Sequence, residues 1–324
     1  MKYSVLFVDD ESQILETIRN IFDKFYTIYT AENGQKALDI LAKTKVQVIV
    51  SDQRMPGMSG TEFLKICKEK YPDTVRILVT GFSDLDSVIE TINTGDIFRF
   101  ISKPWKLEKL KETIDLAGQL FDQVQAVKTK SDLPSRSFSG PAVLQSHAPS
   151  VSTGFKSKSH LLFVDESESQ LFSYREVFGS DYFVHVANSA EKAFAALAQY
   201  PIAVLVCEAQ IGETDGIDFI SVIRDDHPDV VPILLTDIKD IDLAVRLINE
   251  GRIFRYFIKP YRKEHFVSEM EKAVQQHQNY SVKPELNIRK IEDELISEKG
   301  KEKPATLSES LRLTRERLNK RVGY

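Results

Sequence analysis

The sequence predicts an α/β protein in which one small, doubly wound domain occurs twice. Short runs rich in Val, Ile and Leu alternate with segments of helical periodicity, the pattern of a parallel sheet covered on both faces. Polar residues then recur at a constant offset of 156 residues, as for Asp52 and Glu208 (208 − 52) or Lys103 and Lys259 (259 − 103). Such repetition indicates two domains of one kind.

Five apolar runs in the first copy are the expected strands. They lie near residues 4–8, 26–30, 47–51, 75–79 and 97–101. Between them, segments such as residues 37–41 and 88–92 carry apolar side chains at i, i+3 and i+4, which indicates helices with one buried face. In a doubly wound sheet of this kind, ligands bind outside the carboxyl ends of the strands, where the strand order reverses.

Polar residues stand at the carboxyl ends of four of these strands. Asp9 and Asp10 end the first strand, and Asp52 follows the third. Thr80 follows the fourth strand and Lys103 the fifth. Residues far apart in the sequence are therefore expected to meet at one edge of the sheet.

The chain divides into four predicted parts. The first domain covers residues 1–125, a linker rich in Ser, Pro and Gly covers 126–158, the second domain covers 159–279, and a charged tail covers 280–324. Two short amphipathic helices are expected in the tail, after Pro284 and Pro304. They are too short to fold alone, so they must dock, dimerise or remain partly disordered.

Composition limits the class of protein. The net charge of −5 provides no global basic field that would attract nucleic acid. No apolar run approaches the roughly 18 residues that span a bilayer, and the N-terminus lacks the apolar core of a signal peptide. We therefore expect a cytoplasmic protein. Cys67 and Cys207 have no CxxC spacing, and both are predicted to be small buried residues.

Three carboxylates are predicted to gather in the first copy. Repulsion among Asp9, Asp10 and Asp52 is tolerable if a cation sits among them, and hard oxygen ligands suit Mg²⁺. Aspartate is an established nucleophile that forms aspartyl phosphate, which makes Asp52 a candidate nucleophile. Lys103 would place a positive charge on the phosphoryl oxygens, and the Thr80 hydroxyl would add a hydrogen bond.

Each of these residues also has an ordinary structural explanation when taken alone. The pair Asp9 and Asp10 suits the N-terminus of a helix, whose dipole favours acidic side chains. Thr80 could be a capping residue, and Lys103 a solvated charge. These separate explanations would all have to be correct at once. The joint occurrence of the residues at the strand ends therefore favours a functional site.

Four motifs in order carry a resemblance to a known family. They are Leu6-Phe-Val-Asp-Asp10, Ser51-Asp-Gln-Arg-Met-Pro-Gly-Met-Ser-Gly60, Leu78-Val-Thr-Gly81 and Phe100-Ile-Ser-Lys-Pro-Trp105. Together they resemble the receiver domain of bacterial two-component response regulators. The resemblance is strong over residues 1–125 and degenerate over 158–278, and it implies two flavodoxin-like (βα)5 domains in tandem.

The resemblance implies a role for each matching residue of the acidic site. Asp52 would be the phosphoacceptor. Asp10 would bind Mg²⁺ directly, Asp9 through water, and Arg54 through its backbone carbonyl.

The resemblance also implies a switch. Lys103 would bind the phosphoryl group, Thr80 would swing towards it, and Phe100 would turn inward in response. This motion would reshape the face made by the fourth helix, fifth strand and fifth helix, where such domains usually dimerise or meet partners. A symmetric dimer through these faces is our expectation, formed either within one chain or between two.

The second copy keeps most of the site and changes the nucleophile. Glu208 carries its carboxylate one methylene further out than Asp52, so it is displaced from the position that in-line attack requires. Asp237 replaces Gly81, which adds negative charge beside the site. The loop Met55-Pro-Gly-Met becomes Ile211-Gly-Glu-Thr, a third departure that opposes phosphorylation. The retained residues are Asp165, Glu166, Thr236, Tyr256 and Lys259.

Two interpretations of the second copy remain. Glu208 could pair with Lys259 and hold a fixed, active-like state, although one carboxylate charge mimics the phosphoryl charge of about −1.5 to −2 only in part. Alternatively, Lys259 offsets surplus acid and the domain is a scaffold or dimerisation module. The scaffold interpretation is favoured.

The predicted function is a response regulator without an enzymatic output domain. Asp52 would accept a phosphoryl group from a histidine kinase or a histidine phosphotransfer protein and switch protein–protein interactions. Its only catalysis would be self-catalysed transfer and slow autodephosphorylation. One alternative is a phosphate sink or relay intermediate. Another is DNA binding through basic residues of the tail, which are Arg312, Arg315, Arg317, Lys320 and Arg321.

Overall fold

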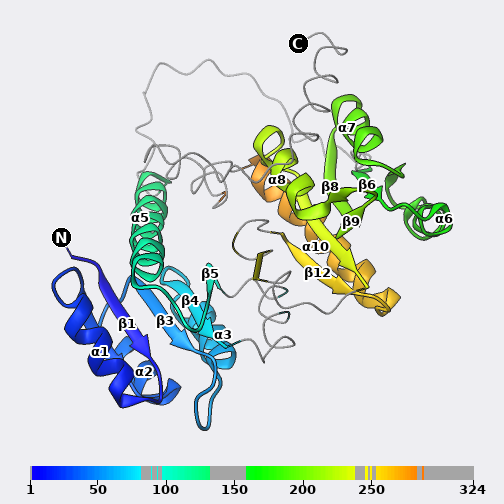
Figure 1. The fold of residues 1–324 in the computed structure, drawn as a ribbon. Coiled ribbons are helices and arrows are strands. Elements are labelled where there is room, and N and C mark those ends of the chain that lie inside the picture. The colour runs from blue at the N-terminus through cyan, green and yellow to red at the C-terminus, as the bar shows by residue number, and fades with distance from the viewer. Residues whose placement is uncertain are drawn as a thin grey trace, which may run out of the picture.

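The chain folds into two α/β domains of the same topology (Figure 1). The computed structural model describes residues 2–81, 89, 93, 97–131, 158–237, 245–246, 249, 253–282 and 287. Figure 1 shows the two domains as separate lobes, the first in blue and cyan and the second in green to orange. The predicted fold class is confirmed.

The first domain is built on a five-stranded parallel sheet with the order β2-β1-β3-β4-β5. Its strands are β1 (Ser4–Val8), β2 (Thr27–Ala31), β3 (Val48–Asp52), β4 (Val75–Thr80) and β5 (Arg99–Ser102). The described helices are α1 (Ser12–Phe22), α2 (Gly34–Leu41), α3 (Gly60–Lys70) and α5 (Leu107–Ser131). The expected strands are present within about two residues, and Asp52 and Thr80 end strands rather than follow them.

The second domain repeats this plan with the order β12-β11-β8-β6-β7. Its strands are β6 (His160–Val164), β7 (Phe183–Ala187), β8 (Ile202–Glu208), β11 (Val231–Thr236) and β12 (Arg255–Ile258). Its described helices are α6 (Glu168–Phe178), α7 (Ala190–Gln199), α8 (Gly216–Asp226) and α10 (Lys263–Val282). A short antiparallel hairpin of β9 (Gln210–Ile211) and β10 (Thr214–Asp215) follows β8.

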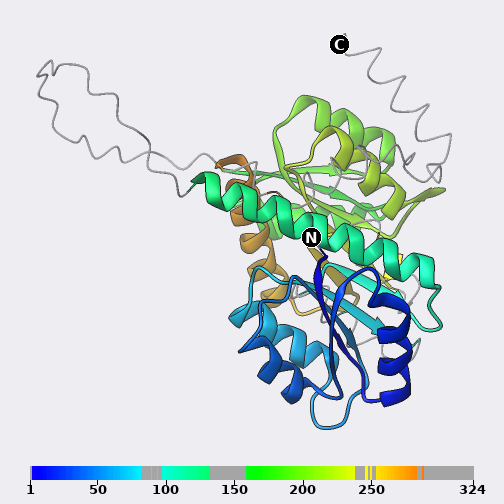
Figure 2. The same cartoon turned by 90° about the vertical axis from the view of Figure 1, so that its left-hand side faces the viewer.

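Both faces of each sheet are buried. Figure 2 shows α1 on one side of the first sheet and α2 with α3 on the other. On one face of each sheet the core belongs to that domain alone. On the opposite face a single apolar cluster includes residues of both domains, among them Phe100 and Tyr256. The two domains are therefore joined by shared apolar packing as well as by the chain.

The domain ends differ slightly from the expected ones. Helix α5 continues through Ser131, so the first residues of the expected linker are helical. Helix α10 ends at Val282, a little beyond the expected boundary. The rest of the linker and the expected tail helices lie outside the described residues. Within the tail, Asn287 is buried and its side-chain amide donates to the carbonyl of Pro228 at 2.9 Å, so this point of the tail contacts the second domain.

Both cysteines are free and buried, as predicted, Cys67 in α3 and Cys207 in β8. Among the described residues, no helix combines the length and the apolarity needed to cross a membrane.

Candidate functional site

The candidate site of the first domain lies where β1 and β3 end side by side. Helices connect to these two strands on opposite faces of the sheet, so a crevice opens at this point. Asp9 follows β1, and Asp52 is the last residue of β3. Both side chains are buried, with 8% and 7% of their side-chain surfaces exposed, whereas Asp10 is exposed. The structure therefore brings Asp9 and Asp52 together and leaves Asp10 at the rim.

Lys103 brings its positive charge to both buried carboxylates. Its Nζ lies 3.0 Å from Asp9 Oδ2 and 2.5 Å from Asp52 Oδ1. Lys103 directly follows β5, and its backbone N–H donates to the carbonyl of Thr80 at 2.9 Å. The peptide bond between Lys103 and Pro104 is cis. The last two strands of the sheet thus hold the ammonium group over the acidic edge.

Burial and charge act in opposite directions on these groups. Burial raises the pKa of Asp52, and this effect outweighs the lowering by Lys103 and by the backbone N–H of Arg54. Burial alone would lower the pKa of Lys103, but hydrogen bonds and charges from Asp52 and Asp9 raise it above its usual value. Lys103 therefore stays protonated, and Asp52 carries a carboxylate that has lost part of its hydration.

Backbone N–H groups fix the orientation of the carboxylates. The N–H of Glu11 donates to Asp9 Oδ1 at 3.0 Å, and the N–H of Arg54 donates to Asp52 Oδ2 at 2.6 Å. Each carboxylate thus uses one oxygen for the backbone and offers the other to Lys103. The backbone carbonyl of Arg54, predicted as a metal ligand, belongs to the loop that begins directly after Asp52.

Gly60 allows α3 to begin close to the site, a requirement that sequence reasoning missed. A Cβ atom at this position would lie 2.1 Å from the carbonyl oxygen of Asp52, far inside any real contact distance. Ser59 and Glu62 form a capping box at the start of the same helix. The second domain has the same feature, since a Cβ on Gly216 would lie 2.1 Å from the carbonyl oxygen of Glu208. The matching offset of these glycines (216 − 60) was the signal that could have found them.

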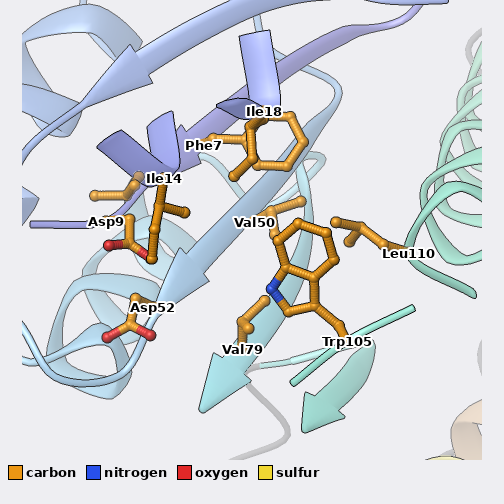
Figure 3. A pocket seen from close by; sticks show the side chains of 10 residues that line it. Phe7, Asp9, Ile14, Ile18, Val50, Asp52, Val79, Trp105 and Leu110 are labelled. Carbon is orange, nitrogen blue, oxygen red and sulfur yellow. The ribbon is translucent and has the colours of Figure 1, made fainter. Parts of the chain in front are cut away.

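An apolar pocket lies beneath the carboxylates. Figure 3 shows Asp9 and Asp52 on one side of this pocket and the ring of Trp105 on the other. Val50 and Val79 contribute to its walls. Because such walls exclude water, they explain why burial is the largest influence on the pKa of Asp52. The role of Trp105 as a wall of the site did not follow from the sequence.

The cation that balances the buried carboxylates in the structure is Lys103. Among the residues that the structure describes, no three His, Cys, Asp or Glu side chains are arranged to hold a metal ion together. The Lys103 ammonium thus offsets the repulsion between Asp9 and Asp52, as the sequence analysis expects of a cation at this place. The donors still fit Mg²⁺, because this ion commonly takes only one or two carboxylates and keeps several waters.

The two predicted switch residues are both buried. Thr80 is 1% exposed, and its hydroxyl donates to the carbonyl of Gly81 at 3.2 Å. Phe100 is 2% exposed and lies in β5, three residues before Lys103. The structure thus places Thr80 at the site and Phe100 on the strand that carries the site lysine.

The second domain contains the ion pair considered from the sequence. The ammonium of Lys259 contacts Glu208 closely and lies 3.4 Å from Asp165 Oδ2. Burial is the main reason that the pKa of Glu208 rises to about 7, with Lys259 lowering it and Asp165 raising it. Thr236 and Tyr256 are buried like their counterparts, at 2% and 1% exposure, and Glu166 is exposed like Asp10.

The loop after the acidic strand differs between the domains. In the second domain it folds back as the β9–β10 hairpin, with Gly212 at its turn in the left-handed region (φ +61). The carboxylate of Glu166 approaches this turn, because a Cβ on Gly212 would lie 3.1 Å from its Oε1. Asp215 ends the hairpin, caps α8 and pairs with Arg246 at 2.9 Å. The loop beside the second site is therefore held by contacts that differ from those of the first domain.

These features define a small doubly wound α/β domain with a buried acid and a lysine at its switch point, present twice. The chain belongs to the family of response regulator receiver domains, whose model matches residues 5–115 and 161–271. The match covers both domains, which agrees with the predicted tandem arrangement.

Several relatives match the chain over one domain's length. The hydrogenase transcriptional regulatory protein HoxA of Cupriavidus necator is 37% identical over 111 residues, which are 34% of this chain and 23% of HoxA. Sporulation initiation phosphotransferase F of Bacillus subtilis is 30% identical over 115 residues, 35% of this chain and 92% of that protein. Because the chain covers only about a quarter of HoxA, the activity of that whole protein cannot be carried over.

One solved structure of a single domain is also similar to part of the chain. The signal receiver domain of an HD domain-containing protein from Pseudomonas fluorescens is 32% identical, with a TM-score of 0.37, and covers 38% of this chain and 98% of that one.

Proposed function

We propose that this protein is a response regulator of a two-component phosphorelay and that Asp52 is its phosphoacceptor. The observation that carries the proposal is the contact of Asp52 Oδ1 with Lys103 Nζ at 2.5 Å, beside Asp9 at the switch point. The phosphoryl donor would be a histidine kinase or a histidine phosphotransfer protein. The consequence of phosphorylation would be a change in protein–protein contacts.

The geometry supports a division of roles within the site. A carboxylate oxygen of Asp52 would attack the phosphorus atom, and the donor's histidine nitrogen would leave with the bonding electron pair. Lys103 would then pair with the phosphoryl oxygens instead of the free carboxylate, which requires only a small movement of its ammonium group. The N–H of Arg54 already orients the second carboxylate oxygen of Asp52.

Mg²⁺ is the proposed cofactor. Asp10 and the Arg54 backbone carbonyl would hold it together with Asp52, and Asp9 would do so through water. When bound, it supplies positive charge that lowers the repulsion between the carboxylate and the incoming phosphoryl group.

We propose that the second domain is not phosphorylated. Glu208 carries its carboxylate one methylene further out than Asp52, Asp237 stands in place of Gly81, and the β9–β10 hairpin replaces the loop of the first domain. The chain as a whole would have no enzymatic activity on a separate substrate, apart from self-catalysed transfer and slow loss of its own phosphoryl group.

A role as a relay intermediate or phosphate sink is the second candidate. It is favoured by the similarity to a relative named sporulation initiation phosphotransferase, of which this chain covers 92%. A relay intermediate would return its phosphoryl group rapidly to a histidine phosphotransfer protein, whereas a switch would keep it. DNA binding through the basic tail remains a minor alternative, and its residues lie outside the described part of the chain.

Mass spectrometry after incubation with acetyl phosphate and Mg²⁺ tests the proposal. We expect one added phosphoryl group on the wild-type chain and none on Asp52→Asn. Glu208→Asp should not add a second group, because Asp237 and the hairpin remain. A phosphoryl group located in residues 159–279 of the wild-type chain would overturn the proposed asymmetry, and an unmodified wild type would overturn the function itself.

A further inference from the structure

Two asparagines join the domains in a reciprocal way. The side-chain carbonyl of Asn249 accepts from the backbone N–H of Phe100 at 3.1 Å, and its amide donates to the carbonyl of Phe100 at 2.9 Å. In return, Asn93 accepts from the N–H of Tyr256 at 2.7 Å and donates to the carbonyl of Tyr256 at 2.9 Å. Both pairs follow the offset of the repeat (249 − 93 and 256 − 100), so the contact is symmetric.

Each asparagine completes the edge of a sheet. β5 and β12 are the last strands of their sheets, and edge strands leave backbone N–H and C=O groups that need partners. An asparagine side chain carries one acceptor and two donors, so it can bond both groups of one residue as a neighbouring strand would. The first domain therefore closes the edge of the second, and the second closes the edge of the first.

Apolar contacts surround these hydrogen bonds. Ile89 and Val245, each four residues before its asparagine, pack against the apolar cluster that includes Phe100 and Tyr256. Arg246 pairs with Asp215 at 2.9 Å and Asp218 at 3.2 Å within its own domain. Arg246, three residues before Asn249 in the sequence, is thus anchored in the second domain.

The contact reaches the candidate site through one short strand. β5 has four residues, with Phe100 as its second, and Lys103 follows directly after the strand. Three residues of extended chain span about 10 Å. A movement of β5 at Phe100 must therefore move Lys103, whose ammonium group bonds Asp52 and Asp9.

We propose that the second domain is the internal binding partner of the first and that Asn249, by clamping β5, acts as a positioning residue for Lys103 at the phosphorylation site. This inference rests on the proposed phosphorylation of Asp52. Without the clamp, β5 is an edge strand bonded only to β4 at this position, and Lys103 is held less firmly. Domain docking and phosphorylation are then coupled, so each must favour the other.

The two asparagines provide a matched pair of variants. Asn249→Ala removes the clamp on Phe100, whereas Asn93→Ala removes the equivalent clamp on Tyr256 and leaves β5 of the first domain bonded. Each variant weakens docking by removing the two hydrogen bonds of one asparagine side chain. The double variant Asn93→Ala/Asn249→Ala should separate the domains and increase the radius of gyration in small-angle X-ray scattering.

Two measurements on the full-length chain test the proposal. Hydrogen exchange followed by NMR should show the Phe100 amide protected in the wild type and exposed in Asn249→Ala, with the Tyr256 amide responding to Asn93→Ala instead. The rate of phosphorylation by acetyl phosphate and Mg²⁺ should fall about fivefold in Asn249→Ala, which corresponds to about 1 kcal/mol in the reaction barrier, and less than twofold in Asn93→Ala.

The outcomes separate this inference from the proposed function. Rapid exchange of the Phe100 amide in the wild type would overturn the docking contact, whatever the chemistry of Asp52. Equal rates in wild type and Asn249→Ala, or equal slowing in both single variants, would overturn the role of the clamp while leaving phosphorylation intact. A wild type with a protected Phe100 amide but no phosphorylation would overturn the proposed function and the positioning role, and would leave the docking contact standing.

Discussion

At the scale of single residues, the candidate site depends on the close approach of the α3 backbone to the end of β3 as much as on the charges of Asp52 and Lys103. Asp52 and Lys103 could be predicted from the sequence because charged residues at the ends of buried strands indicate a functional site. Gly60 belongs to one of the four motifs, but its residue type indicates no chemistry, because its function is the space that it leaves empty. That space lets α3 begin against the carbonyl of Asp52.

This requirement gives a stability prediction. Gly60→Ala places a methyl group 2.1 Å from the Asp52 carbonyl oxygen, so the start of α3 or the end of β3 must shift. We expect the first domain to lose about 3 kcal/mol, the upper end of the usual cost of overpacking. Trp105 is the single tryptophan of the chain and lies in the first domain, so thermal unfolding followed by its fluorescence reads this loss.

The control for Gly60→Ala is Gly81→Ala. A Cβ atom on Gly81 meets nothing within 4 Å, so this variant should unfold within about 0.5 kcal/mol of the wild type, as expected for a substitution that creates no clash. Equal free energies of unfolding for Gly60→Ala and the wild type would contradict the prediction, because the end of β3 and the start of α3 would then move apart without loss of stability.

At the scale of elements, the apolar runs predicted all five strands of the first sheet because a strand buried on both faces leaves a continuous signal. The contacts of Asn93 and Asn249 were not predicted. A polar residue within a helical pattern ordinarily faces solvent, and nothing in local periodicity shows that it bonds an edge strand. Only the common offset of these residues, considered with the strand order, would have indicated it.

One element contact is specific to the second domain and predicts a pH dependence. Glu269 of α10 pairs with Arg255 of β12 and lies 2.6 Å from Lys272. Burial alone would raise the pKa of Glu269, but the hydrogen bonds from Lys272 and Arg255 outweigh it and hold the pKa below its usual value. The counterpart of Glu269 in the first domain is Thr113 (269 − 156).

Glu269→Gln should therefore destabilise the second domain by about 2 kcal/mol at pH 7, since it removes a charged hydrogen-bond partner of Arg255. A lowered carboxyl pKa stabilises the fold above the unfolded value of about 4.3, and this contribution is lost as the pH falls through the folded pKa. The difference between variant and wild type, measured by circular dichroism in urea, should shrink below about pH 4. The exposed Glu271→Gln serves as the control, and a difference that persisted at low pH would contradict the assignment.

At the scale of the whole molecule, the shared apolar cluster makes the two domains thermodynamic partners. Phe100 and Tyr256 belong to one cluster, and each has its backbone bonded by an asparagine of the other domain. Each folded domain is therefore a ligand of the other. A ligand that binds only the folded state stabilises it, and the covalent connection keeps this ligand at a high effective concentration.

Unfolding of the second domain should consequently weaken the first. Gly216→Ala places a methyl group 2.1 Å from the Glu208 carbonyl oxygen, so its clash lies entirely within the second domain. In a chain with docked domains, we expect this variant also to lower the unfolding temperature of the first domain by several degrees, corresponding to about 1 kcal/mol of lost docking energy.

Trp105 fluorescence follows the unfolding of the first domain, and circular dichroism follows the unfolding of both. In the background Asn93→Ala/Asn249→Ala, where docking is already lost, Gly216→Ala should leave the Trp105 transition unchanged. If Gly216→Ala left the unfolding temperature read by Trp105 unchanged in both backgrounds, the domains would fold independently and the shared cluster would contribute no stability.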